Sequence, residues 1–354
     1  MLLGCMNVAQ ERARFDTTVG QASIEGATVE VEEGRASVRS LEQGRVEVWA
    51  QAPTLTLHLT ASQTGVWEVV ARNMVSDVEA FQVTDTGQEG PLEVQSNPLP
   101  TVFTWNVTAV AGERVTLRLE PPDAVDRGSW QFVMYADVQD RIDDVQDIYE
   151  TMQTFPDVRF GLISGDLTEE GSRSQLERFQ REMETLPFPC YATLGNHELG
   201  VDEHLFQRLY GRVNASFGYR GVRFTLLDSA SATIAPQVHG WLDGWLDEGR
   251  DGLHLVMMHI PPLDPVGFRN GAFASRSEAN ALLAKLARGG VDMTVYGHVH
   301  SYYTFTNAGI EAFISGGGGA IPQRQDGVGR HFLLVEAYPD QERFTTSMIR
   351  VEPP

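Results

Sequence analysis

The hydrophobic pattern of this 354-residue chain changes near residue 125, and this change constrains the fold more than any other feature. Before that point, hydrophobic and polar residues alternate in short stretches, interrupted by Gly, Pro or Asp roughly every 8 to 12 residues. This alternation is typical of an antiparallel β-sandwich. The clearest stretches are residues 27–32, 45–49, 54–59, 66–70, 103–107 and 114–119. We therefore predict an all-β sandwich over residues 16–122.

After a linker at residues 120–128, short apolar runs alternate with segments whose hydrophobic residues recur at helical spacing. The runs that predict buried strands are residues 132–136, 160–163, 191–194, 224–227, 253–258 and 293–296. The helical faces are formed by Ile142, Val145, Tyr149 and Met152, by Leu176, Phe179, Met183 and Leu186, and by Leu282, Leu283 and Leu286. This alternation predicts an α/β layered domain, a βαβ sandwich, over residues 128–354.

Charge and hydrophobicity narrow the class of protein. The 48 Asp and Glu outnumber the 27 Lys and Arg, which gives a formal net charge of −21. Such a chain is a poor binder of long nucleic acid or anionic lipid, because both require a cationic surface. No run approaches the ~18 apolar residues of a membrane-spanning helix. The single lysine, Lys285, together with the acid excess indicates a high-GC or salt-adapted bacterial source.

The two cysteines, Cys5 and Cys190, cannot form a disulfide framework or a cysteine-rich metal site. Cys190 lies in an apolar run and is predicted to be a buried small hydrophobic residue. Cys5 follows Leu2-Leu3-Gly4, which resembles the lipobox of bacterial lipoproteins. Residues 1–15 are therefore predicted to be a truncated lipoprotein signal and spacer, placing the protein in the cell envelope or outside the cell, with membrane contact only through a lipid anchor. The alternative is a chance match in a cytoplasmic protein.

Polar residues follow most of the predicted strands of the second domain. They form the motifs Asp137-Val-Gln139, Gly165-Asp166, Gly195-Asn196-His197-Glu198, His259 and Gly297-His298-Val-His300. Loops at the carboxyl ends of strands in α/β sheets converge on one crevice, so these side chains are expected to lie together. Oxygen and nitrogen donors without thiolate favour a hard or borderline metal ion. The number of donors exceeds what one tetrahedral ion needs, which favours two ions sharing a bridging carboxylate.

Each residue alone has a simpler explanation. Asp137 or Asp166 can cap the helix that follows it, and Asn196 can be a turn residue. His259, before two prolines, can be a hydrogen-bonded core histidine. The metal site is favoured because all of these residues stand at predicted strand ends.

The motifs, in this order, resemble those of the calcineurin-like metallophosphoesterase superfamily over about residues 130–350. The resemblance implies two divalent or trivalent ions, of Mn, Fe or Zn. By motif, the first would be held by Asp137, Asp166 and His300, with Gln139 as a weak ligand. The second would be held by Asp166, Asn196, His259 and His298, with Asp166 bridging. The resemblance further implies that a hydroxide held by the two ions attacks a phosphoester while His197 protonates the leaving oxygen and Glu198 orients the His197 imidazole.

Two residues depart from the pattern of that superfamily. Gln139 stands where a histidine is usual, which replaces an imidazole by a weaker neutral donor. Glu169 stands where purple acid phosphatases place a tyrosine ligand, so an iron–tyrosinate centre is not expected. The run Gly316–Gly319 lacks the Lys-Ser/Thr ending of a P-loop. The resemblance implies instead a glycine-rich turn that lets the backbone pass close to the site.

Further candidates for contact with substrate are His204, Arg269 and Arg276, which follow motif segments, although solvated surface positions explain them better. The chain is thus predicted to hydrolyse a small phosphomonoester or phosphodiester. The alternative is a catalytically weak metal-binding or ligand-binding protein whose sandwich recognises a glycan or protein partner. The pair His197-Glu198 argues against this alternative, because a binding protein needs no proton donor.

Overall fold

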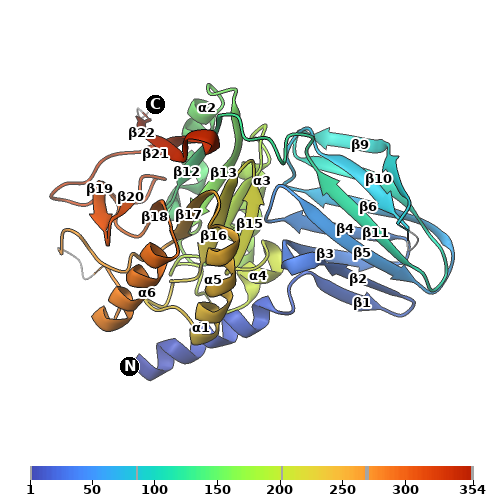
Figure 1. Ribbon diagram of the computed structural model, residues 1–354, viewed down its shortest axis with the longest axis horizontal. Coiled ribbons are helices and arrows are strands. Elements are labelled where there is room, and N and C mark those ends of the chain that lie inside the picture. Colours follow the sequence, from blue (N-terminus) through green and yellow to red (C-terminus); the bar gives the residue numbers. More distant parts are fainter. Residues whose placement is uncertain (1, 85–86, 201, 268–270, 352–354) are drawn as a thin grey trace.

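The computed structural model describes residues 2–84, 87–200, 202–267 and 271–351, with side chains from Val8 onward. The chain is mostly β, and its four sheets are arranged in two pairs (Figure 1). One pair is built from residues 21–120 and encloses a single hydrophobic core. The other is built from residues 130–350, and helices cover both of its outer faces.

The first pair of sheets forms the N-terminal unit, hereafter the sandwich. Its first sheet has the order β1 (Gln21–Ile24), β2 (Ala27–Val31), β5 (Leu55–Ala61), β11 (Arg114–Glu120), β7 (Glu79–Val83) and β8 (Glu89–Leu92). Its second has the order β3 (Ala36–Glu42), β4 (Arg45–Ala50), β6 (Gly65–Arg72), β10 (Val102–Ala109) and β9 (Val94–Leu99). Alternate residues of β5 are buried, as expected for a strand with one face on a core.

One pairing in the sandwich departs from the antiparallel prediction. Strands β4 and β6 are parallel neighbours. The chain crosses to the opposite sheet as β5 between them, so it returns to the second sheet in the same direction. An alternating pattern reports which side of a strand is buried and carries no information on strand direction.

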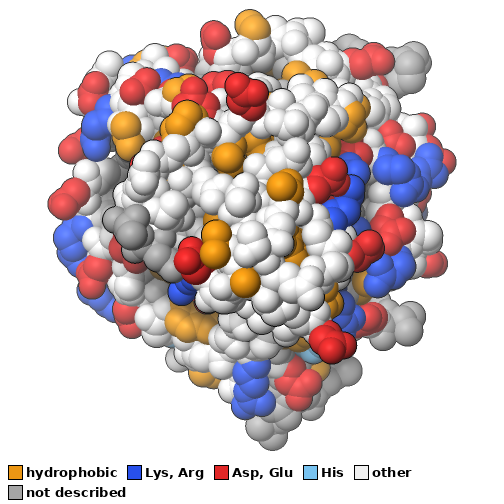
Figure 2. All heavy atoms as spheres, turned by 90° about the vertical axis from the view of Figure 1, so that its right-hand side faces the viewer, with side chains coloured by type: hydrophobic (Ala, Val, Ile, Leu, Met, Phe, Trp, Pro, Cys, Tyr) orange, Lys and Arg blue, Asp and Glu red, His pale blue; other side chains and the backbone are white. Residues whose placement is uncertain are grey.

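The surface at the sandwich end mixes charges of both signs (Figure 2). Hydrophobic side chains on this face lie singly or in small groups among polar atoms. Scattered hydrophobic residues are normal for a folded surface and indicate no particular partner.

The second pair of sheets forms the C-terminal unit. One sheet has the order β14 (Cys190–Thr193), β13 (Val158–Ser164), β12 (Trp130–Tyr135), β21 (His331–Tyr338) and β22 (Arg343–Arg350). The other has the order β15 (Ala215–Tyr219), β16 (Val222–Leu227), β17 (Leu253–Met258), β18 (Met293–Tyr296), β20 (Ile310–Ser315) and β19 (Tyr302–Asn307). Strands β12, β13 and β14 are parallel, as are β16, β17, β18 and β20. Between the sheets, Trp130, Phe132, Phe160 and Phe224 pack edge to face or tilted.

Helices pack on both outer faces of this pair. Helices α2 (Gln146–Met152), α3 (Arg173–Met183) and α4 (Leu205–Leu209) share a core with the sheet that contains β13. Helices α5 (Pro236–Glu248) and α6 (Arg276–Arg288) share a core with the sheet that contains β17. Short 3₁₀ segments cover Glu32–Gly34, Gln139–Asp144 and Pro339–Gln341. The three predicted helical faces are buried, and Ser172 and Ser275 cap α3 and α6 through their hydroxyl oxygens.

The N-terminal segment, predicted to be a truncated lipoprotein signal and spacer, is helical in the structure. Residues Leu2–Asp16 form helix α1, which lies beside α5 at the base of the C-terminal unit (Figure 1). Ala9 and Ala13 are fully buried, and Arg12 pairs with Glu203 and, at 2.7 Å, with buried Asp228. From Val8 onward the segment is therefore part of the folded core, because Ala9 and Ala13 share a hydrophobic core with α5 and Arg12 is paired with carboxylates outside α5. The side chain of Cys5 lies outside the described residues. Among the described helices, none is long and apolar enough to cross a membrane.

The sandwich contacts the edge strand of the C-terminal unit directly. The side-chain amide of Asn73 donates to the carbonyl oxygen of Cys190 at 2.8 Å and accepts from its N–H at 3.0 Å. The amide of Gln51 makes the same two contacts with Ala192, at 2.8 and 3.2 Å. Both amides are buried. Two side chains thus replace the missing neighbour of β14, whose backbone would otherwise be an unpaired sheet edge.

Candidate metal centre

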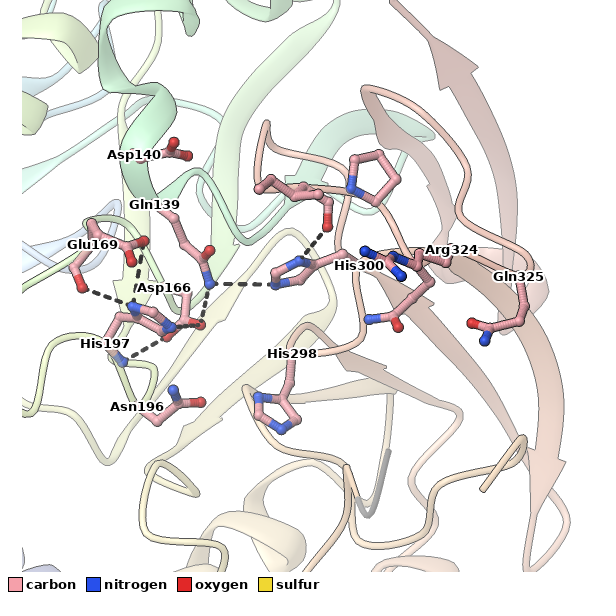
Figure 3. Close-up of a pocket in the computed structure, with 13 residues that line it drawn as sticks. Gln139, Asp140, Asp166, Glu169, Asn196, His197, His298, His300, Arg324 and Gln325 are labelled. Atoms are coloured by element: carbon pink, nitrogen blue, oxygen red, sulfur yellow. Dashed lines mark hydrogen bonds and ion pairs between the residues drawn. The ribbon is translucent and has the colours of Figure 1, made fainter. Parts of the chain in front are cut away.

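The motif residues meet where the two sheets of the C-terminal unit come together at their carboxyl ends. Asp137, Asp166 and Asn196 follow the parallel strands β12, β13 and β14. His259 follows β17, and His298 and His300 follow β18 in the other sheet. Figure 3 shows Asp166 and Asn196 from one sheet facing His298 and His300 from the other across a pocket. The cavity has a volume of about 610 Å³.

Four of these residues have strained backbone. Asp137, Gln139, Asp166 and His298 have positive φ angles, of 63°, 52°, 52° and 69°. Residues other than glycine rarely adopt this conformation, which persists only where the surroundings enforce it and which is concentrated at functional sites. Here the N–H of His298 donates to both oxygens of the Asp137 carboxylate, at 3.1 and 2.9 Å.

Close backbone approach requires glycine at two positions. A Cβ on Gly195 would lie 2.1 Å from Oδ1 of Asp166, and one on Gly316 would lie 2.9 Å from Oδ2 of Asp137. The run that begins at Gly316 therefore passes beside the site without a side chain, as the resemblance implied, and it does not form a phosphate loop.

One group of donor atoms surrounds Asp166. Nε2 of His259 lies 3.2 Å from Oδ2 of Asp166 and 3.2 Å from Oδ1 of Asn196. Ligand atoms of Asp166, His259 and His298 all lie within 4.8 Å of one another. Two ligands bound at ~2.1 Å to one ion are separated by about 3.0–3.4 Å at octahedral or tetrahedral angles, so the spacing suits a shared cation.

A second group surrounds Asp137. Nε2 of His300 lies 3.4 Å from Oδ1 of Asp137 and 3.3 Å from Nε2 of Gln139. Nε2 of Gln139 in turn donates to Oδ2 of Asp166 at 3.1 Å. Rotation of this amide by 180° presents its oxygen instead, so Gln139 can reach the first coordination sphere. Oδ2 of Asp166 contacts both groups, so Asp166 would be the ligand that they share if each group held an ion.

The histidine tautomers show that these groups fit metal ions. Nδ1 of His259 donates to the carbonyl oxygen of Ser164, and Nδ1 of His300 to that of Ile321, both at 2.8 Å. A neutral imidazole held this way directs a lone pair from Nε2 toward the carboxylates. Lone pairs that converge at 3.2–3.4 Å repel unless a cation or a proton lies between them.

Electrostatics support the same conclusion. Burial alone would lower the pKa of His259, but the adjacent Asp166 carboxylate outweighs it and raises this pKa to about 9. Burial would raise the pKa of Asp166, yet His259 and the N–H of His197 hold it well below its usual range. Burial, reinforced by the charge of His259, lowers the pKa of His298 to about 4. The cluster therefore favours an added positive charge at its centre.

The predicted partner of His197 is wrong. Glu198 is buried, and its carboxylate accepts hydrogen bonds from the N–H groups of Asp166, Thr168 and Gly195 at 2.8–2.9 Å. It therefore joins two ligand-bearing loops rather than orienting an imidazole. Burial and the nearby Asp166 charge raise the pKa of Glu198 to about 7.

The residue that contacts His197 is instead Glu169. Nδ1 of His197 lies 2.7 Å from the Glu169 carbonyl oxygen and 3.6 Å from its carboxylate. The His197 side chain is 28 % exposed and lines the cavity. No sequence pattern indicated this role of Glu169, because its contact with His197 is made by a backbone carbonyl. That carbonyl belongs to the loop after β13, whereas His197 lies in the loop after β14.

Residues 131–302 match the family model of the calcineurin-like phosphoesterases. This segment is a calcineurin-like phosphoesterase domain. The chain is 28% identical over 162 residues to a 3′,5′-cyclic-nucleotide phosphodiesterase of Nostoc, covering 42% of this chain and 58% of that protein. It is 33% identical over 125 residues to a probable cyclic nucleotide phosphodiesterase of Synechococcus, covering 31% of this chain and 48% of that protein. The chain thus spans about half the length of these relatives. Among solved structures, a dimetal phosphatase from Danio rerio has a TM-score of 0.48 at 16% identity, covering 61% of this chain and 98% of that one.

Other candidates do not reach the pocket of the phosphoesterase domain. His204 stacks on Phe15 of α1, with ring centroids 4.3 Å apart, and Arg276 begins α6 on an exposed surface. Neither lines the cavity. Arg269 lies outside the described residues. Cys190 is buried as predicted, and burial raises the pKa of its thiol to about 12.

One whole wall of the pocket was not predicted from the sequence. The segment Ile321–Gln325, in the loop between β20 and β21, lines the cavity, as do Asp140 and Glu169 on the other side (Figure 3). The glycine run at residues 316–319 was a signal that the chain passes the site here, but it did not indicate that the following residues turn into the pocket.

Proposed function

We propose that this chain hydrolyses small phosphodiesters at the pocket described above, with His197 as the proton donor to the leaving group. The observation that carries the proposal is the convergence of two donor groups, sharing Asp166, in a cavity of about 610 Å³. Cavities of this size accept ligands the size of a nucleotide.

Metal ions held by the two donor groups would polarise the phosphoryl oxygens and activate water at neutral pH. The protein side chains hold and orient the substrate between the two donor groups. In the reaction, a water oxygen bonds to phosphorus and loses a proton to solvent, and the bond from phosphorus to the leaving oxygen breaks. Nε2 of His197 supplies the proton that this leaving oxygen takes up, and Nδ1 is held by the Glu169 carbonyl oxygen.

The charges around the pocket support a diester rather than a monoester. Beyond the ligands, the cavity is lined by the carboxylates Asp140 and Glu169 and by one cation, Arg324. A diester carries one negative charge and a monoester up to two, so repulsion from this rim is smaller for the diester. The names of the two curated relatives, both cyclic nucleotide phosphodiesterases, make 3′,5′-cyclic nucleotides the first natural substrates to assay.

The test compares bis(p-nitrophenyl) phosphate, p-nitrophenyl phosphate and a 3′,5′-cyclic nucleotide with protein reconstituted with Mn, Zn or Fe. We expect the highest kcat/KM for a diester. Asp166→Asn should lose bound metal and nearly all activity, whereas Asp126→Asn, an exposed position in the linker, should behave as wild type. Folded protein that binds two ions but turns over no ester would favour the alternative of a ligand-binding protein.

A further inference from the structure

The second wall of the pocket is held in a defined place. The Ile321 carbonyl oxygen accepts from Nδ1 of His300 at 2.8 Å, and the N–H of Gln323 donates to the His300 carbonyl oxygen at 3.1 Å. The N–H of Ala320 donates to the carbonyl oxygen of Asp137 at 2.9 Å. The segment is therefore hydrogen-bonded to His300, which follows a strand of one sheet, and to Asp137, which follows a strand of the other. The fold thus sets its position relative to a bound phosphoryl group.

The side chains of this wall differ from the rest of the rim. Ile321 is 72 % exposed, one of few large hydrophobic residues so exposed among those described, and Pro322 beside it is also exposed. Arg324 is the one Lys or Arg among the described residues that line the cavity. Among those residues it has no hydrogen-bond or ion-pair partner. The apolar side chains of Ile321 and Pro322 and the guanidinium of Arg324 thus line the same cavity.

The opposite wall is acidic. Glu169 and His197 lie across the pocket from Arg324 and Gln325 (Figure 3). If His197 protonates the leaving oxygen, the leaving group lies on its side of phosphorus. In an in-line displacement the groups that stay on phosphorus lie around the reaction axis. The organic group that a diester retains therefore contacts another part of the cavity. The wall Ile321–Gln325 is suited to this contact, because it carries uncharged side chains and the cation Arg324.

We propose that Ile321 and Pro322 bind the apolar body of the ester group retained on phosphorus, and that Arg324 contacts an anionic or hydrogen-bond-accepting atom of that group. This inference rests on the proposed function and narrows its substrate class to diesters whose retained group is a ring with polar substituents, such as a nucleoside. In a 3′,5′-cyclic nucleotide the leaving and retained oxygens belong to one sugar, so the part that would reach this wall is the base, which stays attached after ring opening.

The experiment keeps the leaving group constant and varies the retained group. The substrates are the p-nitrophenyl esters of methyl phosphate, phenyl phosphate and thymidine 5′-phosphate, which all release p-nitrophenolate. For Ile321→Ser, the ratio of kcat/KM for the phenyl ester to that for the methyl ester should fall about tenfold. For Arg324→Gln, the ratio of the thymidine ester to the phenyl ester should fall about fivefold. Val125→Ser, an exposed hydrophobic position in the linker, is the matched control and should keep both ratios.

A binding measurement separates recognition from turnover. Thymidine 5′-phosphate keeps the retained group after hydrolysis, so calorimetry should show it binding several-fold more weakly to Ile321→Ser than to wild type. Equal losses for all three esters would overturn the inference, since the loop would then act only through His300. Unchanged ratios with an active wild type would also overturn it while leaving the proposed function intact. A metal-loaded wild type inactive on every ester would overturn both.

Discussion

At the residue scale, His197 is the side chain whose role is most sharply testable. Its imidazole contacts the Glu169 carbonyl oxygen through Nδ1, and its Nε2 lies 3.9 Å from Asp166. A proton donor matters most when the leaving group is a poor one. His197→Ala should therefore lower kcat about 10²-fold or more for an ester with an alkyl leaving group, and far less for one that releases p-nitrophenolate. Equal losses for both esters, at unchanged metal content, would contradict the role.

His254 provides a prediction about stability away from the site. It is fully buried on β17, Nε2 contacts the hydroxyl of Thr225 at 2.9 Å, and burial, with a smaller effect of Arg223, lowers its pKa to about 4. In the unfolded chain this histidine binds a proton near pH 6.5, whereas in the folded chain it stays neutral. The free energy of unfolding therefore decreases as pH falls. Between pH 7 and 5 the loss is about 2 kcal/mol.

Replacement of this histidine removes the titrating group. Urea denaturation at pH 7 and pH 5 gives the decrease in the free energy of unfolding between the two pH values. We expect this decrease to be about 2 kcal/mol smaller for His254→Gln than for wild type. The absolute stability of the variant is not the readout. A pH dependence as steep as that of wild type would show that His254 does not stay neutral in the folded state.

At the element scale, the amides that bind β14 connect the sandwich to the loop carrying Asn196. Gln51→Leu keeps the volume but leaves the N–H and carbonyl of Ala192 buried without partners. This should lower the free energy of unfolding by about 2–4 kcal/mol, measured by chemical denaturation.

The chain offers a matched control for this change. Gln82 makes the same pair of contacts, with the N–H and carbonyl of Thr108, but its side chain is only half-buried and these hydrogen bonds are exposed to solvent. Gln82→Leu should therefore cost less than about 1 kcal/mol, because water can replace the lost hydrogen bonds. Equal costs for the two variants would mean that burial of the β14 edge does not stabilise the contact between the units.

The parallel strands β12, β13, β14, β16, β17 and β18 of the C-terminal unit were predicted closely, whereas β15, β19, β20 and β22 and the edge strands of the sandwich were not. Apolar runs at residues 253–258 and 293–296 coincide with β17 and β18, because strands buried on both faces read as continuous hydrophobic segments. Strand β9 has mostly exposed residues, and β1 and β8 are half-exposed, so no hydrophobic pattern marks them. Helix α1 carries small and charged residues whose burial depends on α5.

At the scale of the whole molecule, the candidate metal ligands come from both sheets of the C-terminal unit, so a bound ion would link the two sheets at their carboxyl ends. Ions that bind the folded state only should stabilise it by about 2.7 kcal/mol at 100 times their Kd. Addition of Mn or Zn to chelator-treated protein should therefore raise Tm by several degrees, as measured by calorimetry.

The variants described above serve as controls. Asp166→Asn should lose most of this metal-dependent rise in Tm, since it removes the charge that both donor groups share. Asp126→Asn should keep it. A wild-type Tm that does not respond to any of these metals would argue against a metal centre in this pocket.

The residue pattern alone was enough to predict the change of architecture near residue 125 and the strand-end positions of the candidate ligands. These are local properties, since hydrophobic period and motif order do not depend on distant residues. The contact partners could be identified only in the folded chain: Glu169 rather than Glu198 for His197, Gln51 and Asn73 for β14, and Ile321–Gln325 for the second wall. Each of these contacts joins segments far apart in the chain through a backbone carbonyl, a side-chain amide or a turn direction, and none of these leaves a periodic signal in sequence.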